Sequence, residues 1–473
     1  MLKDTRLESD SIGTLHVPSN AYYGVQALRA QRNFPITGHG MHPVFIQNLA
    51  KVKKACALTN RNALDLSAAK ASAIITACDE IITGRLRSEF IVDTIQGGAG
   101  TSANMNMNEV IANRAIELLG GTKGDYRVVH PNDDVNMAQS TNDVIPTAGK
   151  LTVLDLTDHL EDALKRLEDA LLSKASAFDD VLKMGRTQLQ DAVPMRLGQS
   201  FGAYASMIDR DIRRIKKVSS EMLTVNLGGT AIGSCINATP DYESRIVSNL
   251  SRVCRHPVKQ AGDLFDATEN LDGFVMVSGA LKACAVNLSK MCNDLRLLSS
   301  GPRTGFGEIT LPAMQNGSSI MPGKVNPVIP EVVNQVAFLV IGHDTTITLA
   351  AEAGQMELNA FEPVVFTTLF ESLDTLTEGI ETLVTNCIIG ITPNIPRCSD
   401  LVNSSVGIAT ALCPVLGYKK SATVAKKALA TGKSVRDIVL EESLMPESEL
   451  DALLDPMAMT ALPENPATLH TAV

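Results

Sequence analysis

Residues 271–298 have the sequence LDGFVMVSGALKACAVNLSKMCNDLRLL, and this stretch decides the fold. Its polar residues are few, and small residues such as Ser278, Gly279 and Ala280 are frequent. A helix that is apolar around most of its circumference has to be buried on several sides. Such a helix is typical of the interior of a helical bundle, and we expect other subunits to complete that bundle.

Two further stretches place their apolar residues at helical spacing. Residues 151–178 carry leucines on one face with charged residues between them, and residues 201–223 repeat this pattern with a basic face. We interpret the basic face as a solvated or inter-subunit surface rather than an anion site. Strand and helix patterns do not alternate along the chain, which disfavours a doubly wound α/β fold. The sequence therefore predicts a mainly α protein.

The two ends of the chain differ from its middle. Residues 1–45 are rich in Gly and Pro, and the sequence TPNIP at 392–396 interrupts the helical pattern. We therefore predict three domains: an N-terminal domain at 1–140, a central long-helix domain at 141–395 and a small helical domain at 396–473.

The composition excludes several classes of protein. The chain has 473 residues, with 42 Lys+Arg against 52 Asp+Glu, whereas a nucleic-acid binder needs clustered positive charge. The charged N-terminus lacks the apolar core of a secretory signal, and we find no window of the ~20 uncharged apolar residues that a membrane helix needs. The nine cysteines are scattered and never spaced C-x-x-C, which is typical of reduced thiols. We expect a cytoplasmic protein without a nucleic-acid partner, a membrane partner or a metal site.

Four polar segments interrupt the helical pattern and offer hydroxyls, amides and backbone N–H groups. Such groups bind carboxylates without a full counter-charge for each anion. Each segment alone is typical of an ordinary loop with a helix cap, but four of them in a helical chain indicate a shared site. The segments are QGGAGTSAN at 96–104, HPND at 130–133 continuing to QSTND at 139–143, GRTQLQD at 185–191 and GSSIMPGKVNP at 317–327.

Several catalytic motifs do not fit the chain. The segment 317–324 resembles a phosphate-binding P-loop, but five residues separate its glycines, and Val325 stands where Ser or Thr must reach Mg²⁺. The sequence GAG at 98–100 lacks the third glycine of a dinucleotide-binding turn. Neither a G-x-S-x-G elbow nor an H-E-x-x-H zinc motif occurs.

Ser318 is the candidate base. It lies between Gly317 and Ser319 in a glycine-rich stretch, and glycine frees the backbone to point several N–H groups at one oxygen. A serine hydroxyl ionises far above neutral pH, and each pKa unit of lowering needs about 1.4 kcal/mol. Only a closed, dry and preorganised site, completed by a loop that closes over the substrate, supplies that much.

The segment GSSIMPGKVNP at 317–327 resembles the signature loop of the fumarase/aspartase superfamily. The sequences GAGTS at 98–102, STND at 140–143 and GRTQ at 185–188 resemble the other shared regions in the same order. The resemblance covers nearly the whole chain. It implies a three-domain fold in which long central helices form a common bundle of a homotetramer, with each active site assembled from three subunits. It also implies reversible anti elimination from a succinyl skeleton through an aci-carboxylate, with no cofactor required.

Within the superfamily, the chain resembles the ammonia-lyase branch more than the fumarase branch. Fumarases carry His where Gln188 stands, and NPVIPE at 326–331 and STN at 140–142 are also similar to the ammonia-lyase branch. A glutamine cannot titrate, so a His–carboxylate relay is not available. This likeness implies L-aspartate as the substrate, with fumarate and ammonia as products. Fumarate hydration, or elimination from a modified aspartate, remain the alternatives.

The resemblance also implies a role for each site residue. Ser318 resembles the general base that takes the Cβ proton. The residues that resemble the cradle of the β-carboxylate are Thr101, Ser140, Thr141 and Ser319. Those that resemble the α-carboxylate site are Thr187, Lys324 and Asn326, and those that resemble the contacts to the amine are Asn142 and Gln188.

Some positions depart from the family pattern. Cys235 stands where glycine is usual, and Cys413 replaces a common Asn. These two changes bear on substrate size rather than on the type of reaction. The sequence HPND at 130–133 resembles a second anion site of fumarases, although a structural turn explains it equally well.

Overall fold

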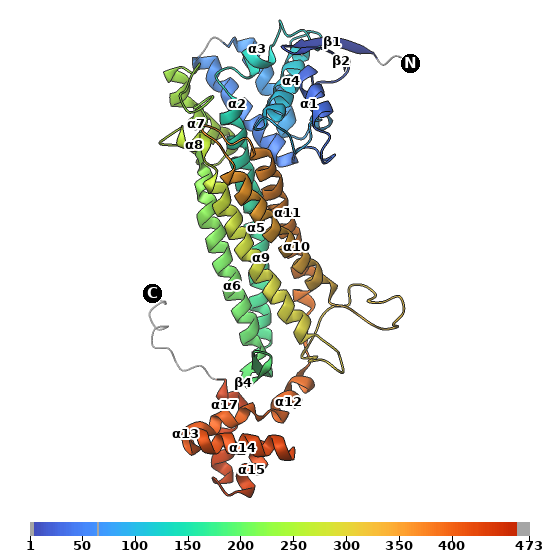
Figure 1. Ribbon diagram of the computed structural model, residues 1–473, viewed down its shortest axis with the longest axis vertical. Coiled ribbons are helices and arrows are strands. Elements are labelled where there is room, and N and C mark those ends of the chain that lie inside the picture. The colour runs from blue at the N-terminus through green and yellow to red at the C-terminus, as the bar shows by residue number, and fades with distance from the viewer. Residues whose placement is uncertain (1–3, 64–65, 461–473) are drawn as a thin grey trace. The chain divides into compact units, whose positions relative to one another are not determined.

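The computed structural model describes residues 4–63 and 66–460 (Figure 1). Within them, helices dominate and every sheet has only two strands, so the predicted mainly α class is confirmed. The longer helices are α1 (Val25–Asn33), α2 (Pro43–Ala63), α3 (Ala68–Ile82), α4 (Thr101–Leu118), α5 (Thr141–Ala177), α6 (Leu197–Ser219), α7 (Pro240–Cys254), α9 (Asp272–Leu298), α10 (Val328–Glu352), α11 (Glu362–Asn386), α12 (Ile395–Ser404) and α14 (Tyr418–Thr431).

The remaining elements are short. The short α-helices are α8 (Asp266–Glu269), α13 (Cys413–Leu416), α15 (Val435–Glu441), α16 (Glu447–Leu453) and α17 (Pro456–Met459). Short helices of other types are η1 (Arg87–Glu89), η2 (Pro131–Val135), η3 (Ser220–Leu223), η4 (Ile388–Gly390) and η5 (Val406–Leu412). The strands pair as β1 (Thr5–Asp10) with β2 (Gly13–Pro18), β3 (Leu182–Thr187) with β4 (Gln190–Arg196), β5 (Thr224–Val225) with β6 (Lys259–Gln260), and β7 (Ile309–Thr310) with β8 (Thr392–Pro393).

The described chain divides into two compact units. The first holds the described residues up to Asp162 together with Asp211–Val286 and Val336–Glu378. The second holds Ala163–Arg210, Asn287–Gln335 and the described residues from Gly379 onward. Because each unit combines separate stretches of the chain, the division into 1–140, 141–395 and 396–473 remains a prediction.

Aromatic packing joins α11 to α9 in the first unit, and α5 closely approaches the same ring of α11. Phe366 of α11 stacks on Phe370 at 5.8 Å between ring centroids and meets Phe274 of α9 edge-on at 5.2 Å. A Cβ at Gly149 of α5 would lie 2.6 Å from the ring of Phe366. Only glycine therefore allows α5 to approach so closely, and the start of α5 is fixed against the core.

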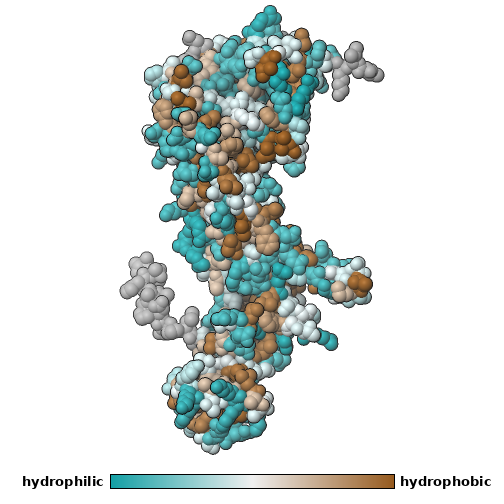
Figure 2. Space-filling view, in the orientation of Figure 1, coloured by the Kyte–Doolittle hydropathy of each residue, from teal (hydrophilic) through white to brown (hydrophobic). Residues whose placement is uncertain are grey.

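The helix predicted for residues 271–298 is confirmed as α9, at Asp272–Leu298. In the single chain, α9 leaves Met276 and Val286 about half exposed, at 51 % each, and α10 exposes Phe338 and Leu349, at 62 % each. Figure 2 shows hydrophobic residues on the visible face of the helical part of the chain. In the single chain, α9 and α10 therefore leave several large apolar side chains in contact with solvent.

By length and composition, α10 is also apolar enough to cross a membrane, contrary to the expectation from its polar residues. One of those polar residues, Asp344, is buried and accepts hydrogen bonds from Ser278 and Lys282 of α9. These contacts are those of a helix packed inside a protein, since a buried carboxylate needs partners of this kind.

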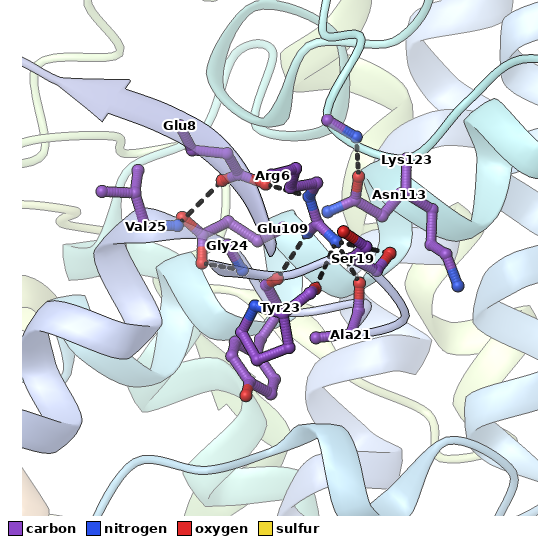
Figure 3. Close-up of polar contacts among 12 residues, drawn as sticks. Arg6, Glu8, Ser19, Ala21, Tyr23, Gly24, Val25, Glu109, Asn113 and Lys123 are labelled. Atoms are coloured by element: carbon purple, nitrogen blue, oxygen red, sulfur yellow. Dashed lines mark hydrogen bonds and ion pairs between the residues drawn. The ribbon is translucent and has the colours of Figure 1, made fainter. Parts of the chain in front are cut away.

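Two buried carboxylates hold the start of α1 (Figure 3). Glu109 of α4 accepts hydrogen bonds from the backbone N–H groups of Gly24, Gln26 and Ala27, and Glu8 of β1 accepts one from Val25. These groups are N–H donors that a helix start leaves without partners. Burial raises the pKa of Glu109 to about 7, against the opposing effect of the three N–H donors.

Candidate active site

In the first unit, Thr101 begins α4 and Thr141 begins α5. Gly100, at the start of α4, has φ +85°, and a Cβ there would lie 2.9 Å from Ile145 of α5. The Nδ2 of Asn104 donates to the Oγ1 of Thr141 at 3.2 Å. The two helix starts are therefore in contact, and the predicted cradle segments around Thr101 and Thr141 come together.

A buried carboxylate fixes the segment that follows Gln139. Asp143 is fully buried; its Oδ1 accepts from the N–H of Ser140 at 2.9 Å, and its Oδ2 accepts from the N–H groups of Gly228 and Thr230 at 3.1 Å each. Burial raises the pKa of Asp143 to about 6, although these backbone donors oppose the shift. This residue ties the turn at Ser140 to a loop far along the chain.

The orientation of the Asn142 amide follows from its partners. The Nδ2 of Asn142 donates to the backbone carbonyl oxygen of Ala231 at 2.7 Å, and the backbone carbonyl oxygen of Asn142 accepts from the Nδ2 of Asn226 at 2.9 Å. Since a carbonyl can only accept, the nitrogen of the Asn142 amide is fixed on that side. The group that Asn142 offers to a ligand is therefore its Oδ1, an acceptor suited to an ammonium ion.

The loop that receives Asn142 has an unusual backbone. Thr230, Cys235 and Asn237 have φ values of +58°, +57° and +66°, a region that costs a non-glycine residue roughly 1–2 kcal/mol. The Sγ of Cys235 lies 3.9 Å from the carbonyl oxygen of Gly233, and burial raises the pKa of this thiol. Cys235 is thus a protonated thiol in a position whose backbone favours glycine.

In the second unit, Gln188 lies at the tip of the β3–β4 hairpin. Thr187 pairs with Gln190, so Gln188 and Leu189 form a two-residue turn with φ values of +54° and +62°. Such turns favour Asn-Gly because both central residues need positive φ. A strained backbone held at an exposed tip is typical of a functional position.

A buried carboxylate anchors strand β3 of this hairpin close to its turn. The Nη1 of Arg186 lies 2.8 Å from the Oε2 of Glu308, which is fully buried, and the Nζ of Lys183 lies 4.0 Å from its Oε1. The guanidinium of Arg186 also lies 4.2 Å from the centre of the Phe306 ring. This pair was not predicted from the sequence, and two cations within the six-residue strand β3 were the signal that could have revealed it.

The loop that connects α9 with α10 carries Ser318, and Figure 1 shows it as an extended segment. The two ends of its tip are hydrogen-bonded to each other. The N–H of Gly317 donates to the backbone carbonyl oxygen of Lys324 at 2.8 Å, and the Nδ2 of Asn326 donates to the backbone carbonyl oxygen of Gly317 at 2.9 Å. A Cβ at Gly317 would lie 2.6 Å from the carbonyl oxygen of Lys324, so only glycine fits.

The Oγ of Ser318 accepts hydrogen bonds from the backbone N–H groups of Ile320 at 3.2 Å and Met321 at 3.0 Å. The glycine-rich sequence predicts N–H groups aimed at one oxygen here, and Ser318 has two such donors. Donors to an oxygen favour its anionic form. Ser319 and Lys324 are exposed in the single chain, so water reaches this loop.

The predicted site residues fall into two sets. The first unit holds Thr101, Ser140, Thr141 and Asn142, which lie at the adjoining starts of α4 and α5. The second unit holds Thr187, Gln188, Ser318, Ser319, Lys324 and Asn326. Among the described residues, no hydrogen bond joins Thr187 or Gln188 to the loop at 317–326, and no group of three or more His, Cys, Asp or Glu is arranged to hold a metal ion.

Comparison with known proteins identifies the family. Residues 13–342 match the family model described as Lyase, and residues 408–461 match the model described as Fumarase C C-terminus. The chain belongs to this lyase family. The predicted resemblance to the fumarase/aspartase superfamily is thus confirmed, and the matched range contains all ten predicted site residues.

Lyases with curated names resemble the chain over nearly their whole length. An aspartate ammonia-lyase from Pseudomonas aeruginosa is 53 % identical over 97 % of each chain, and one from Bacillus sp. is 49 % identical over 97 % of this chain and 98 % of its own. Solved structures of the lyase family agree. A fumarate lyase:delta crystallin from Brucella melitensis has a TM-score of 0.94 at 49 % identity, covering 97 % of this chain and 100 % of its own. A class II fumarase from Schistosoma mansoni has a TM-score of 0.94 at 34 % identity, covering 98 % and 100 %.

Proposed function

We propose that the chain catalyses the reversible elimination of ammonia from L-aspartate to give fumarate. The observation that carries this proposal is its 49–53 % identity to curated aspartate ammonia-lyases over nearly the whole chain. The site chemistry supports it, because the Nδ2 of Asn142 is held by Ala231, which leaves its Oδ1 as the acceptor, and Gln188 brings an amide where fumarases use histidine. An ammonium ion offers hydrogens to both amide oxygens.

Ser318 acts as the general base that removes the Cβ proton. The two N–H donors to its Oγ stabilise an alkoxide, but a hydroxyl in contact with water remains protonated at neutral pH. The exposed loop therefore needs a cover. We propose a homotetramer in which three subunits complete each site and exclude water, and the apolar residues exposed on α9 and α10 support such an assembly.

The electrons of the Cβ–H bond move into the neighbouring carboxylate, which becomes an aci-carboxylate dianion. Thr101, Ser140, Thr141 and Ser319 hold this carboxylate with neutral donors. Lys324, Asn326 and Thr187 hold the α-carboxylate. Collapse of the dianion forms the C=C bond and breaks the Cα–N bond, whose electron pair leaves with ammonia. Donors placed where charge develops lower the barrier by roughly 3–4 kcal/mol each.

This chemistry requires no cofactor, and its partners are L-aspartate, fumarate, ammonia and further copies of the chain. We propose that the enzyme works in the cytoplasm and binds neither nucleic acid nor a membrane, in line with its net charge of −10 and its scattered thiols.

The experiment that tests the function follows fumarate by its ultraviolet absorbance with L-aspartate or L-malate as substrate. Fumarate from L-aspartate alone supports the proposal. Fumarate from L-malate alone overturns it in favour of a hydratase that works with Gln188 in place of histidine. Fumarate from neither, in a folded protein, favours a modified aspartate and makes Cys235 the first residue to replace by glycine.

A further inference from the structure

A fully buried lysine lies beneath the predicted carboxylate cradle. Lys53 of α2 has no exposed surface, and its Nζ donates to the Oδ1 of Asn136 at 2.8 Å and to the Oε1 of Gln139 at 2.9 Å. The proposed mechanism does not use this residue. Burying an ammonium group is costly unless hydrogen bonds compensate it, so its position calls for an explanation.

Lys53 remains a cation at neutral pH. Burial lowers the pKa of its ammonium to about 8, and nearby Asp143, Cys56 and Cys78 oppose that shift. Both hydrogen-bond acceptors of Lys53 are neutral amides, so the anion that offsets its charge is the nearby carboxylate of Asp143 and not either of these two partners.

Asn136 links this cation to α4. Its Oδ1 also accepts from the Nδ2 of Asn104 at 3.2 Å and from the Nδ2 of Asn108 at 3.1 Å. The same Nδ2 of Asn104 donates to the Oγ1 of Thr141. One side chain, Asn104, therefore connects the acceptor of Lys53 with a hydroxyl of the predicted cradle.

Gln139 links the cation to the turn that leads into the cradle. It directly precedes Ser140, and its Nε2 donates to the carbonyl oxygens of Val135 and Met137 at 3.0 Å each. Ala138, which lies between Met137 and Gln139, has a φ of +58°, a conformation that the surroundings must enforce. A hydrogen bond from Lys53 fixes the other end of the Gln139 amide.

We infer that Lys53 is a positioning residue for the elimination: by holding the amides of Asn136 and Gln139, it aims the hydroxyls of Ser140 and Thr141 at the carboxylate that gains charge. This inference rests on the proposed function and deepens it. The buried cation also favours additional negative charge above it, and that charge is larger in the dianion than in aspartate. The contribution of Lys53 is therefore greater for the intermediate than for the bound substrate.

The test compares two ligands in the full chain. Succinate has the two carboxylates of the bound substrate. The nitronate of 3-nitropropionate carries a planar charged group where the intermediate has its aci-carboxylate. It is formed in base and then added to the protein at pH 7.5. For Lys53→Met, we expect nitronate binding to weaken at least tenfold more than succinate binding, and kcat with L-aspartate to fall by a similar factor.

Lys54→Met is the matched control, because Lys54 is the next residue of α2 and its ammonium pairs with the half-exposed Asp79. This variant should keep the affinities for both ligands and the wild-type kcat within about twofold. If Lys53→Met does not fold, Gln139→Met takes its place. This variant removes one of the two acceptors of Lys53 and leaves the ammonium bound to Asn136. It should also weaken nitronate binding more than succinate binding.

Equal weakening of both ligands in a folded variant would show that Lys53 supports the core and not the intermediate, and would overturn the inference. Unchanged binding and kcat would overturn it as well. In both cases fumarate from L-aspartate with the wild-type protein leaves the proposed function standing. A wild-type protein that releases no fumarate overturns the proposed function, and the inference fails with it.

Discussion

Replacing Glu109 by glutamine should remove a pH dependence from the stability of the chain. Glu109 has a pKa of about 7 in the folded protein, against 4.5 for an ordinary glutamate. Below pH 4.5 the carboxyl is protonated whether the chain is folded or unfolded. As pH rises towards 7, the unfolded chain releases this proton first, so the free energy of unfolding falls. A difference of about 2.5 units at about 1.4 kcal/mol each gives a loss of roughly 3–4 kcal/mol.

The assay is urea unfolding at pH 4.5 and pH 8 at a fixed protein concentration. The stability difference between these two pH values should shrink by about 3 kcal/mol in Glu109→Gln relative to the wild type, while other titrating groups cancel in the comparison. Glu117→Gln, on the same helix, is the control. Burial by itself would raise the pKa of Glu117, but hydrogen bonds from Tyr22 and Arg114 hold it below its usual value. Glu117→Gln should therefore alter the pH dependence of stability in the opposite sense. The same pH dependence in Glu109→Gln and the wild type would refute the reasoning.

Three further predictions concern the second unit. Ser318→Ala should keep the far-ultraviolet circular dichroism spectrum and lower kcat by at least ~10²–10⁴, since the base is lost; a rate within tenfold of wild type would exclude Ser318 as the base. Glu308→Gln should lower the free energy of unfolding by ~3–5 kcal/mol, because it leaves Arg186 buried without its carboxylate; a thermal melt unchanged within error would show that the pair adds nothing. Gln188→Gly should raise stability by up to about 1 kcal/mol by relieving a positive φ, yet lower kcat/KM by ~10-fold through loss of an amine contact. If the free energy of unfolding and kcat/KM both rise or both fall in this variant, either the backbone strain at Gln188 or its contact to the amine is wrong.

The sequence predicts those features that depend on neighbouring residues. Apolar spacing alone places a helix at 271–298, and the observed α9 begins one residue later. The glycines of GSSIMPGKVNP predict N–H groups aimed at one serine oxygen, and Ser318 has two such donors. Both patterns lie within a few consecutive residues, so local geometry is sufficient to interpret them.

Features that depend on contacts between distant residues cannot be predicted from the sequence pattern. Lys53 is one of several lysines on α2, and only the packing of α2 against its neighbours separates it from the partly exposed Lys51 and Lys54. Glu308 meets Arg186 across 122 positions of the chain. Periodicity would have hinted at Lys53, because it follows the buried Leu49 by four residues, but nothing local identifies its amide partners.

The bonds of Asp143 also set an order of events during synthesis. Its partner Gly228 lies 85 residues further along the chain. At about 5–20 residues per second, a ribosome takes roughly 4–17 s to add that stretch. During this interval the nascent chain contains Ser140, whose N–H binds the Oδ1 of Asp143, but not the N–H groups of Gly228 and Thr230 that bind its Oδ2. The turn that presents these hydroxyls therefore reaches its final shape only after the ribosome has passed Thr230, well after α4 and the beginning of α5 have been made.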